Sequence, residues 1–167
     1  MTQKRDRRAE IVEKSRDIFL RYGYRKTTVA DIGRACGLGK AALYHYFPSK
    51  EAIFAAVVEE ESLKLLVHIR SAVSAAEGPR AKFKALFITR FRRITELMSE
   101  VRGYVPDLLP QANAARARFF DEEAKLLAEI LDEGRREGVF RRVEASSIAL
   151  IIAGIRGVEA EFAARYS

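Results

Sequence analysis

The fold of this chain is decided by the stretch Thr27-Thr-Val-Ala-Asp-Ile-Gly-Arg-Ala-Cys-Gly-Leu-Gly-Lys-Ala-Ala-Leu-Tyr-His-Tyr-Phe-Pro-Ser-Lys-Glu51. Thr28 is a good helix N-cap, and Asp31, three residues later, can complete a capping box and suits the positive end of the helix dipole. We therefore expect a helix to begin at about Val29. Gly37 can adopt the positive φ that ends such a helix and starts a tight turn.

A second short helix is predicted after this turn, from about Gly39 to Phe47. It would bury Leu43 and Phe47, and it must end before Pro48, whose ring disfavours helical geometry in the preceding residue. Two helices joined by a short glycine turn form a helix-turn-helix, whose second helix enters the major groove of DNA. The exposed face of this second helix carries Lys40, Ala41, Ala42, Tyr44, His45 and Tyr46.

The net positive charge of the chain lies in its first fifty residues. Residues 1–50 hold 12 Lys or Arg against 5 Asp or Glu, whereas residues 51–167 hold 18 of each, which accounts for the formal net charge of +7. A basic surface binds polyanions because neutralised phosphates release their counterions. A basic N-terminus taken alone is also typical of a solvated surface. Its coincidence with the helix-turn-helix indicates double-stranded DNA as the partner.

Composition bounds the class of protein. A chain of 167 residues with 49% hydrophobic residues can bury one or two modest cores. Its one cysteine, Cys36, falls on the apolar stripe of the first short helix, so we expect a small buried core residue. The charged N-terminus does not resemble a signal peptide, and no apolar run is long enough to span a bilayer. We expect a cytoplasmic protein without a membrane partner.

The rest of the chain has helical periodicity and no strand-like alternation or internal repeat. Gly23 ends the first helix, and Ser49 caps a long helix that begins at Lys50. The predicted fold class is all-α, with a three-helix head over residues 1–49 that the long helix joins to a helical body over residues 50–167. The helices outside the quoted stretch are expected at about residues 4–22, 50–75, 80–101, 111–137 and 144–165.

The quoted stretch resembles the N-terminal signature of the TetR family of transcriptional regulators, T-x-x-x-I-x-x-x-x-G-x-x-x-x-x-L-Y-x-Y-F-x-x-K. The resemblance covers about residues 8–58. Residues Ile130–Phe140 resemble the end of the family's seventh helix more weakly. Gly39 and Ala41 depart from the serine and glycine that the family often has there. The signature positions are matched by Thr28, Ile32, Gly37, Leu43, Tyr44, Tyr46, Phe47 and Lys50.

The resemblance implies roles for residues of the head. Thr28 and Lys50 would each contact a DNA phosphate, and Tyr44 and Tyr46 would offer their hydroxyls to the DNA backbone. The residues nearest the base edges would be Lys40, Ala41, Ala42 and His45, through hydrogen bonds or methyl contacts. The alternative for Tyr46 is that it packs against the first helix.

The resemblance also implies that the body binds a ligand and forms a homodimer, usually through the last two helices. Here the chain ends where the family's penultimate helix would end, so either the usual last helix is missing from this sequence or the dimer is built differently. The alternative for the apolar stripe on this helix is burial inside the monomer. The dimer candidates are Ile148, Ile151, Ile152, Ile155, Val158 and Phe162.

Polar residues on apolar faces of the body indicate where a small-molecule effector would bind. In one reading, Arg90 or His68 orients a polar or anionic group of the ligand in an apolar cavity. In the other, Glu61 and Arg90 form an ion pair and the aromatic residues fill a packed core. The candidate ligand contacts are Glu61, His68, Phe87, Arg90, Phe91, Tyr104 and Phe119.

Three classes of function can be compared on these features. An enzyme is disfavoured, because the sequence has no nucleophile beside a base, no phosphate-binding glycine loop and no metal-ligand spacing, and we expect no cofactor or metal. A ligand- or protein-binding module that has lost operator binding would have a less basic head. The sequence favours a ligand-responsive repressor that binds a palindromic operator as a dimer and is released by a small molecule.

Overall fold

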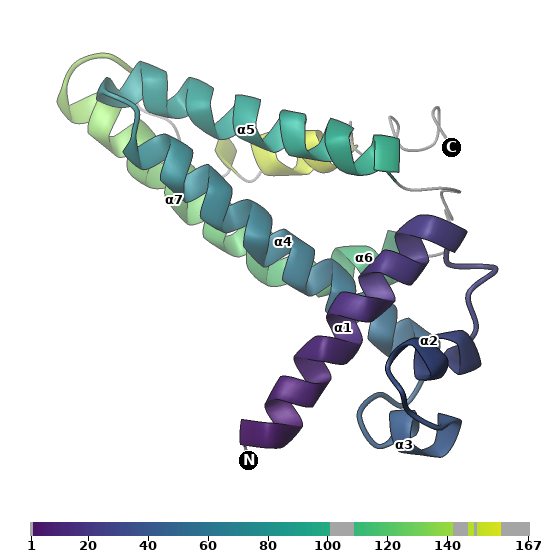
Figure 1. Ribbon diagram of the computed structural model, residues 1–167. Coiled ribbons are helices and arrows are strands. Elements are labelled where there is room, and N and C mark those ends of the chain that lie inside the picture. The colour runs from purple at the N-terminus through teal and green to yellow at the C-terminus, as the bar shows by residue number, and fades with distance from the viewer. Residues whose placement is uncertain (1, 101–108, 142–146, 149, 158–167) are drawn as a thin grey trace. The chain divides into compact units, whose positions relative to one another are not determined.

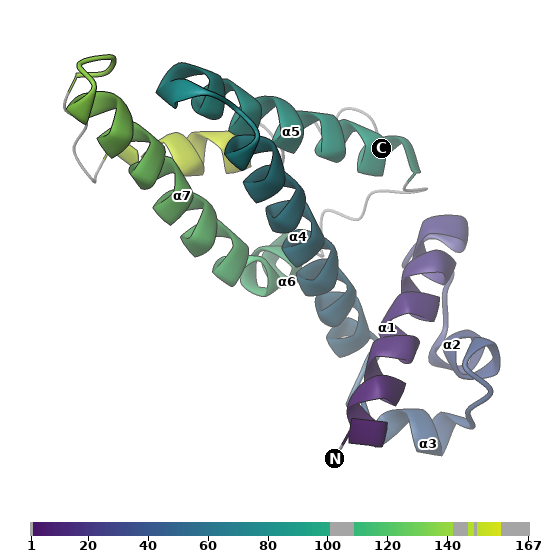
Figure 2. The same cartoon turned by 60° about the vertical axis from the view of Figure 1, so that its left-hand side comes forward.

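The computed structural model describes residues 2–100, 109–141, 147–148 and 150–157. These residues form helices and the turns between them, with no strand in these ranges, as the all-α prediction requires. None of the helices in this part of the chain is long and apolar enough to cross a membrane. Figures 1 and 2 show the seven labelled helices, and residues 147–148 and 150–157 are also helical.

Helices α1, α2, α4 and α5 begin and end close to the predicted positions. Gly23 and Gly78 have φ values of 78° and 77°, the left-handed conformation in which glycine most readily separates one helix from the next. The bounds are α1 Thr2–Tyr22, α2 Val29–Ala35, α3 Lys40–Tyr44, α4 Lys50–Ser74, α5 Gly78–Glu100, α6 Leu109–Ala115 and α7 Ala117–Arg136.

The chain divides into two compact units, which we call the head and the body. Among the described residues, the head comprises residues 2–60, 99–100 and 109–115, and the body comprises residues 61–98, 116–141, 147–148 and 150–157. Helix α4 contributes to both, because its first residues belong to the head and the rest to the body. The head therefore extends past residue 49, since Ile53 and Val57 on α4 are part of its core.

The head is organised around one apolar cluster to which α1, α2, α3 and α4 all contribute. Each buried aliphatic or aromatic side chain in such a cluster contributes about 1.5 to 3 kcal/mol relative to an exposed one. Cys36 is 3% exposed and lies in this cluster, as the sequence predicts. The cluster consists of Ile11, Val12, Phe19, Ile32, Cys36, Leu43, Phe47, Ile53 and Val57.

The turn between α2 and α3 depends on two glycines. Gly37 has a φ of 64°, which confirms the predicted positive φ. A Cβ atom on Gly33 would lie 2.7 Å from the backbone oxygen of Leu38, and the Leu38 amide donates to the Gly33 carbonyl at 2.8 Å. The small residue at position 33 therefore allows the turn itself to fold back against α2.

Helix α3 is shorter than predicted. It ends at Tyr44, with His45 as its C-cap, whereas the sequence pattern extended it to Phe47. The Tyr46 and Phe47 amides still donate to the Leu43 carbonyl at 3.0 and 3.1 Å, so the chain continues as a turn that buries Phe47. Pro48 disfavours helical geometry at Phe47, so the helix does not resume after this turn.

The body surrounds a second apolar cluster. It combines α4, α5, α7 and the helical residues 150–157, and Figures 1 and 2 show these segments alongside one another. The fully buried members include Ile69, Leu86 and Leu127. The complete cluster is Leu65, Leu66, Ile69, Val73, Leu86, Phe119, Phe120, Leu126, Leu127, Ile130, Ile152 and Ile155.

The long helix predicted at 111–137 is interrupted. Arg116 has φ −90° and ψ 0°, and it separates α6 from α7. Neither glycine nor proline occurs at this point, so the sequence gives no helix-breaking signal there. Of the last predicted helix, residues 147–148 and 150–157 are helical and the remainder lies outside the described residues.

Candidate functional sites

The exposed face of α3 and its C-cap carry three polar side chains and one alanine. Lys40, Ala41, Tyr44 and His45 are exposed, and Tyr44 retains 43% of its accessible surface, while Leu43 beneath them is fully buried. This confirms the predicted division of the helix into a buried and an exposed face. Gly39 precedes α3 in an extended conformation and makes no side-chain cap.

Three of the predicted DNA contacts, Ala42, Tyr46 and Lys50, are less exposed than the others. Ala42 is half-buried, and so is Tyr46, which packs against the head core. The Tyr46 carbonyl accepts a hydrogen bond from Arg8 Nη1 on α1 at 2.7 Å. Tyr46 therefore contributes to the packing of the head, as the alternative interpretation of the sequence proposed.

Thr28 and Asp31 form the predicted capping box at the start of α2. The Asp31 amide donates to Thr28 Oγ1 at 3.2 Å, and the Thr28 amide donates to Asp31 Oδ2 at 2.9 Å. The Thr28 hydroxyl also donates to Asp31 Oδ2, at 2.6 Å, and this hydrogen bond lowers the pKa of Asp31 below its ordinary value. The hydroxyl that would serve a phosphate is thus engaged by Asp31 in this structure.

Lys50 lies at the first position of α4, and its amine points back into the head. Lys50 Nζ donates to the carbonyl oxygens of Tyr24 and Thr27 at 2.9 and 3.0 Å. The same nitrogen lies 4.0 Å from the centroid of the Tyr24 ring, within the range of a cation–π contact. This amine, predicted to pair with a phosphate, holds the loop between α1 and α2.

Tyr24 provides a second connection between this loop and α4. Its hydroxyl donates to Glu51 Oε1 at 2.7 Å, and its ring packs against Phe19 and Phe54. Burial and the neighbouring Glu51 carboxylate raise the pKa of Tyr24, and the hydrogen bond from Tyr24 lowers the pKa of Glu51. The tyrosine hydroxyl therefore stays protonated and the carboxylate stays charged at neutral pH.

Two arginines of α1 contact the helix-turn-helix, one at the end of α2 and one after α3. Arg7 donates to the Cys36 carbonyl at 2.7 Å, at the C-terminal end of α2, and the Arg8 guanidinium carbon lies 4.0 Å from the Phe47 ring centroid. Cations at helix C-termini satisfy free carbonyls and complement the helix dipole. Part of the positive charge of the head is therefore structural, which a basic N-terminal sequence does not reveal.

The interior of the body contains a buried ion pair that the sequence analysis did not predict. Arg90 on α5 and Glu123 on α7 are both 0% exposed and form a salt bridge. The Arg90 guanidinium carbon lies 5.2 Å from the Phe119 ring centroid. Glu123 could have been found, because it falls at helical spacing between Phe119 and Leu127 on the apolar face of α7.

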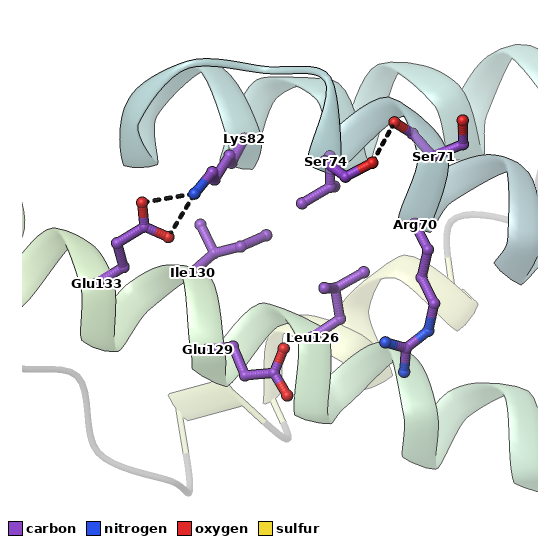
Figure 3. Close-up of a pocket in the computed structure, with 9 residues that line it drawn as sticks. Arg70, Ser71, Ser74, Lys82, Leu126, Glu129, Ile130 and Glu133 are labelled. Carbon is purple, nitrogen blue, oxygen red and sulfur yellow. Dashed lines mark hydrogen bonds and ion pairs between the residues drawn. The ribbon is translucent and has the colours of Figure 1, made fainter.

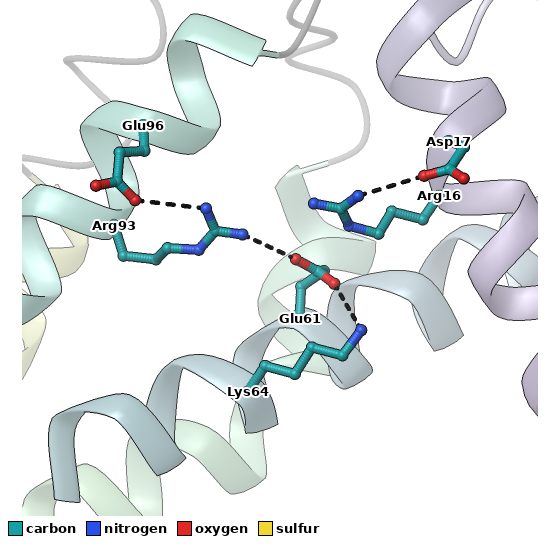
Figure 4. A network of polar contacts seen from close by, with 6 residues as sticks. All are labelled: Arg16, Asp17, Glu61, Lys64, Arg93 and Glu96. Carbon is teal, nitrogen blue, oxygen red and sulfur yellow. Dashed lines mark hydrogen bonds and ion pairs between the residues drawn. The ribbon is translucent and has the colours of Figure 1, made fainter. Parts of the chain in front are cut away.

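The sequence offered Glu61 as a partner of Arg90, and the structure shows Arg90 in a buried salt bridge with Glu123. Glu61 receives hydrogen bonds from Lys64 at 3.1 Å and from Arg93 at 3.3 Å, and Arg93 also lies 3.5 Å from Glu96 (Figure 4). Arg93 lies one helical turn from Arg90 on α5.

The other candidate ligand residues are dispersed. His68 is exposed and Phe91 is 40% exposed, so neither lies on the buried face predicted for it. Phe119 is 1% exposed and Phe87 is half-buried against the body core. Tyr104 lies outside the described residues. The structure thus brings Arg90, Phe87 and Phe119 into the body core and leaves His68 and Phe91 outside it.

A cleft opens on the body between α4, α5 and α7, with a volume of about 620 Å³. Val73, Leu126 and Ile130 form its apolar floor. Figure 3 shows Lys82 bonded to both carboxylate oxygens of Glu133, at 2.6 and 2.8 Å, on one side of it. Its remaining lining residues are Arg70, Ser71, Ser74 and Glu129.

Comparison with known proteins agrees with these features. The family model described as bacterial regulatory proteins, tetR family, matches residues 11–57, from the first core residue of α1 into α4. The HTH-type transcriptional repressor KstR2 of Mycolicibacterium smegmatis is 30% identical over 145 residues, covering 84% of this chain and 70% of that protein. This chain belongs to the TetR family.

Other relatives extend the likeness over the body. KstR2 of Mycobacterium tuberculosis is 28% identical over 143 residues, covering 83% of this chain and 72% of that protein. A transcriptional regulator from Cytophaga hutchinsonii, known from its crystal structure, is 26% identical with a TM-score of 0.74, covering 90% of this chain and 78% of that one. The chain is thus a helix-turn-helix transcriptional repressor of the TetR family, a DNA-binding protein and not an enzyme.

The apolar stripe that TetR proteins would use for dimerisation lies partly inside the monomer here. Ile152 and Ile155 are 6% and 7% exposed and belong to the body core, with Ile148 and Ile151 packed against it. Val158 and Phe162 lie outside the described residues. Ile152 and Ile155 therefore follow the alternative of burial in the monomer, whereas Leu150 on the same segment is 72% exposed.

Proposed function

We propose that this TetR protein is a ligand-responsive repressor that binds a two-fold symmetric operator as a homodimer. The observation that carries the proposal is the exposed face of α3 and its C-cap. Lys40, Tyr44 and His45 are exposed there, while Leu43 on the opposite face is buried. Lysine can bond guanine in the major groove, and tyrosine hydroxyls can bond phosphate oxygens.

Binding to an operator can be tested by selecting bound duplexes from a random library. An inverted repeat, with half-sites about one helical turn or a multiple of it apart, would support a dimer with two recognition helices. His45→Ala should relax base preference at one position more than it weakens binding to mixed-sequence DNA. Equal losses on every sequence would instead place His45 on a phosphate.

The alternative is a helical binding module that no longer recognises DNA. The exposed Lys26 and Lys40 on the head disfavour it, because a basic surface retained beside a helix-turn-helix is suited to phosphates. The alternative predicts that the affinity of the protein for a duplex is negligible and does not change with salt. A steep loss of affinity between low and physiological salt would exclude it.

We further propose that the effector binds in the body, where Arg90 meets Glu123. A buried ion pair is retained at a desolvation cost, and an anionic ligand group could take the place of the Glu123 carboxylate on Arg90. Phe87 and Phe119 would supply apolar contacts to the same ligand. Helix α4 runs from the body into the head, so a change in its body half would bias the DNA-competent state of the dimer.

The cleft on α4, α5 and α7 is a second candidate for the effector, favoured by its volume and its apolar floor. A thermal-shift screen on two variants would separate the two candidates. Hits in the cleft should be lost in Ser74→Trp, which fills its rim, and kept in the Arg90→Met/Glu123→Leu double variant. Hits at the ion pair should show the reverse pattern, and hits kept in both variants would contradict both sites.

A further inference from the structure

The amine of Lys50 has three polar or aromatic neighbours, all of them in the loop between α1 and α2. Nζ bonds the carbonyl oxygens of Tyr24 and Thr27 at 2.9 and 3.0 Å and lies 4.0 Å from the Tyr24 ring centroid. A lysine ammonium has three N–H donors and no acceptor, so two of its three donors are committed to backbone carbonyls. The side chain is half-buried as a result.

One of the two carbonyls that Lys50 bonds, that of Thr27, lies directly before the first helix of the helix-turn-helix. Thr27 is 2% exposed, and its hydroxyl donates to the Gly23 carbonyl at 2.8 Å, which closes the loop on itself. The next residue, Thr28, is the N-cap of α2. The Thr27 carbonyl that Lys50 bonds therefore lies one residue before the N-cap of α2.

Glu51 adds a second connection in parallel with the first. Its carboxylate accepts the Tyr24 hydroxyl at 2.7 Å, so two successive residues of α4 hold the same loop. The Tyr24 ring in turn packs edge-on against Phe54, one turn further along α4, with ring centroids 5.2 Å apart. The first turn of α4 and the start of α2 are thereby joined through polar and aromatic contacts.

We infer that Lys50 is a positioning residue, which supports DNA binding by holding the Thr27–Thr28 backbone against α4 and not by neutralising a phosphate. The inference rests on the proposed DNA contacts of the head. Its consequence is that the contribution of Lys50 to affinity does not depend on salt, whereas that of an exposed cation such as Lys40 does.

The test compares Lys50→Met with Lys40→Met, because each removes one positive charge from the head. Affinity of the full chain for a mixed-sequence duplex of about 30 base pairs is measured across a salt series. Lys40→Met should reduce the slope of log affinity against log salt by about 0.9, as for one lost phosphate contact. Lys50→Met should weaken binding by about tenfold at every salt concentration, with the wild-type slope.

Each outcome decides the inference. If Lys50→Met lowers the slope as much as Lys40→Met does, Lys50 contacts a phosphate and the inference fails while the proposed function stands. If Lys50→Met leaves the affinity of the folded protein unchanged at low temperature, the lysine only adds stability and the inference also fails. A wild-type protein without salt-dependent binding would instead overturn the proposed function.

A second variant covers the case in which Lys50→Met does not fold. Tyr24→Leu keeps the lysine charge but removes the ring beneath the amine and the hydroxyl that bonds Glu51. The inference expects Tyr24→Leu to weaken binding with an unchanged slope, since the loop loses its support. An affinity equal to that of the wild type, measured on folded protein, would overturn it.

Discussion

Arg90 and Glu123 are both inaccessible to solvent and join α5 to α7 through an ion pair inside the body. Removing one member of such a pair leaves an uncompensated charge in the core, while replacing both with apolar residues of similar volume is often neutral. This difference between single and double substitution gives a direct test of the pair.

The single variant Glu123→Leu should therefore lower the free energy of unfolding by about 3 to 5 kcal/mol. The double variant Arg90→Met/Glu123→Leu should recover most of that loss. Urea unfolding followed by circular dichroism measures both values. A double variant as unstable as the single one would show that Arg90 does not depend on Glu123 for its burial.

Two glycines near α3 provide a matched pair for backbone conformation. A Cβ atom would meet nothing within 4 Å at either Gly37 or Gly39, but Gly37 has a φ of 64° and Gly39 a φ of −67°. Gly39→Ser should raise the free energy of unfolding by a few tenths of a kcal/mol, because serine can cap α3. Gly37→Ser should lower it by about 1 to 2 kcal/mol, the cost of a left-handed conformation. Equal effects would contradict the different roles assigned to the two glycines.

The capping box makes the stability of the head depend on pH. The folded-state pKa of Asp31 lies below its ordinary value of 3.8, chiefly through the Thr28 hydrogen bond, so its stabilising effect is present above that value and lost as pH falls through the folded pKa. The difference in Tm between wild type and Asp31→Asn should stay constant above about pH 5 and shrink below about pH 4. In a Thr28→Ala background the same difference should be smaller and flatter. A gap that persists undiminished at about pH 2 would show that the Asp31 charge has no part in the cap.

Gly134 is covered by an aromatic ring. A methyl group at this position on α7 would overlap the ring of Phe140, which also lies 6.0 Å from Phe83 between ring centroids. Gly134→Ala should therefore lower the free energy of unfolding by about 1 to 3 kcal/mol, as overpacking does. Combining it with Phe140→Ala should remove that penalty, so the two substitutions should be non-additive in a double-mutant cycle. Additive losses would show that the ring moves aside without cost.

The head could be predicted from sequence in some detail because its signals are local. The Thr28 cap, the Gly37 turn and the burial of Leu43 each depend on a few neighbouring residues, and all three are found in the structure. The contacts of Lys50 could not be predicted in this way. Its partners, Tyr24 and Thr27, are more than twenty residues away, and only packing brings them to its amine.

The body was harder to predict because its polar contacts depend on which helices pack together. Helical spacing located Arg90 on an apolar face, but its partner Glu123 lies on another helix. His68 falls in a helix whose buried face is set by Leu65 and Ile69, and a difference of one position is enough to expose it. The break at Arg116 has no local signal at all.

The thiol of Cys36 can be used to detect opening of the head core, because it is buried there. Cys36 is the chain's one cysteine, it lies in the head core, and burial raises the pKa of its thiol, so a thiol reagent can modify it only when that core separates. The rate of thiol labelling would therefore measure how often the head core opens, and no probe needs to be introduced. Because α4 runs from this core into the body, the same thiol offers a way to time whether a ligand bound in the body loosens or tightens the head.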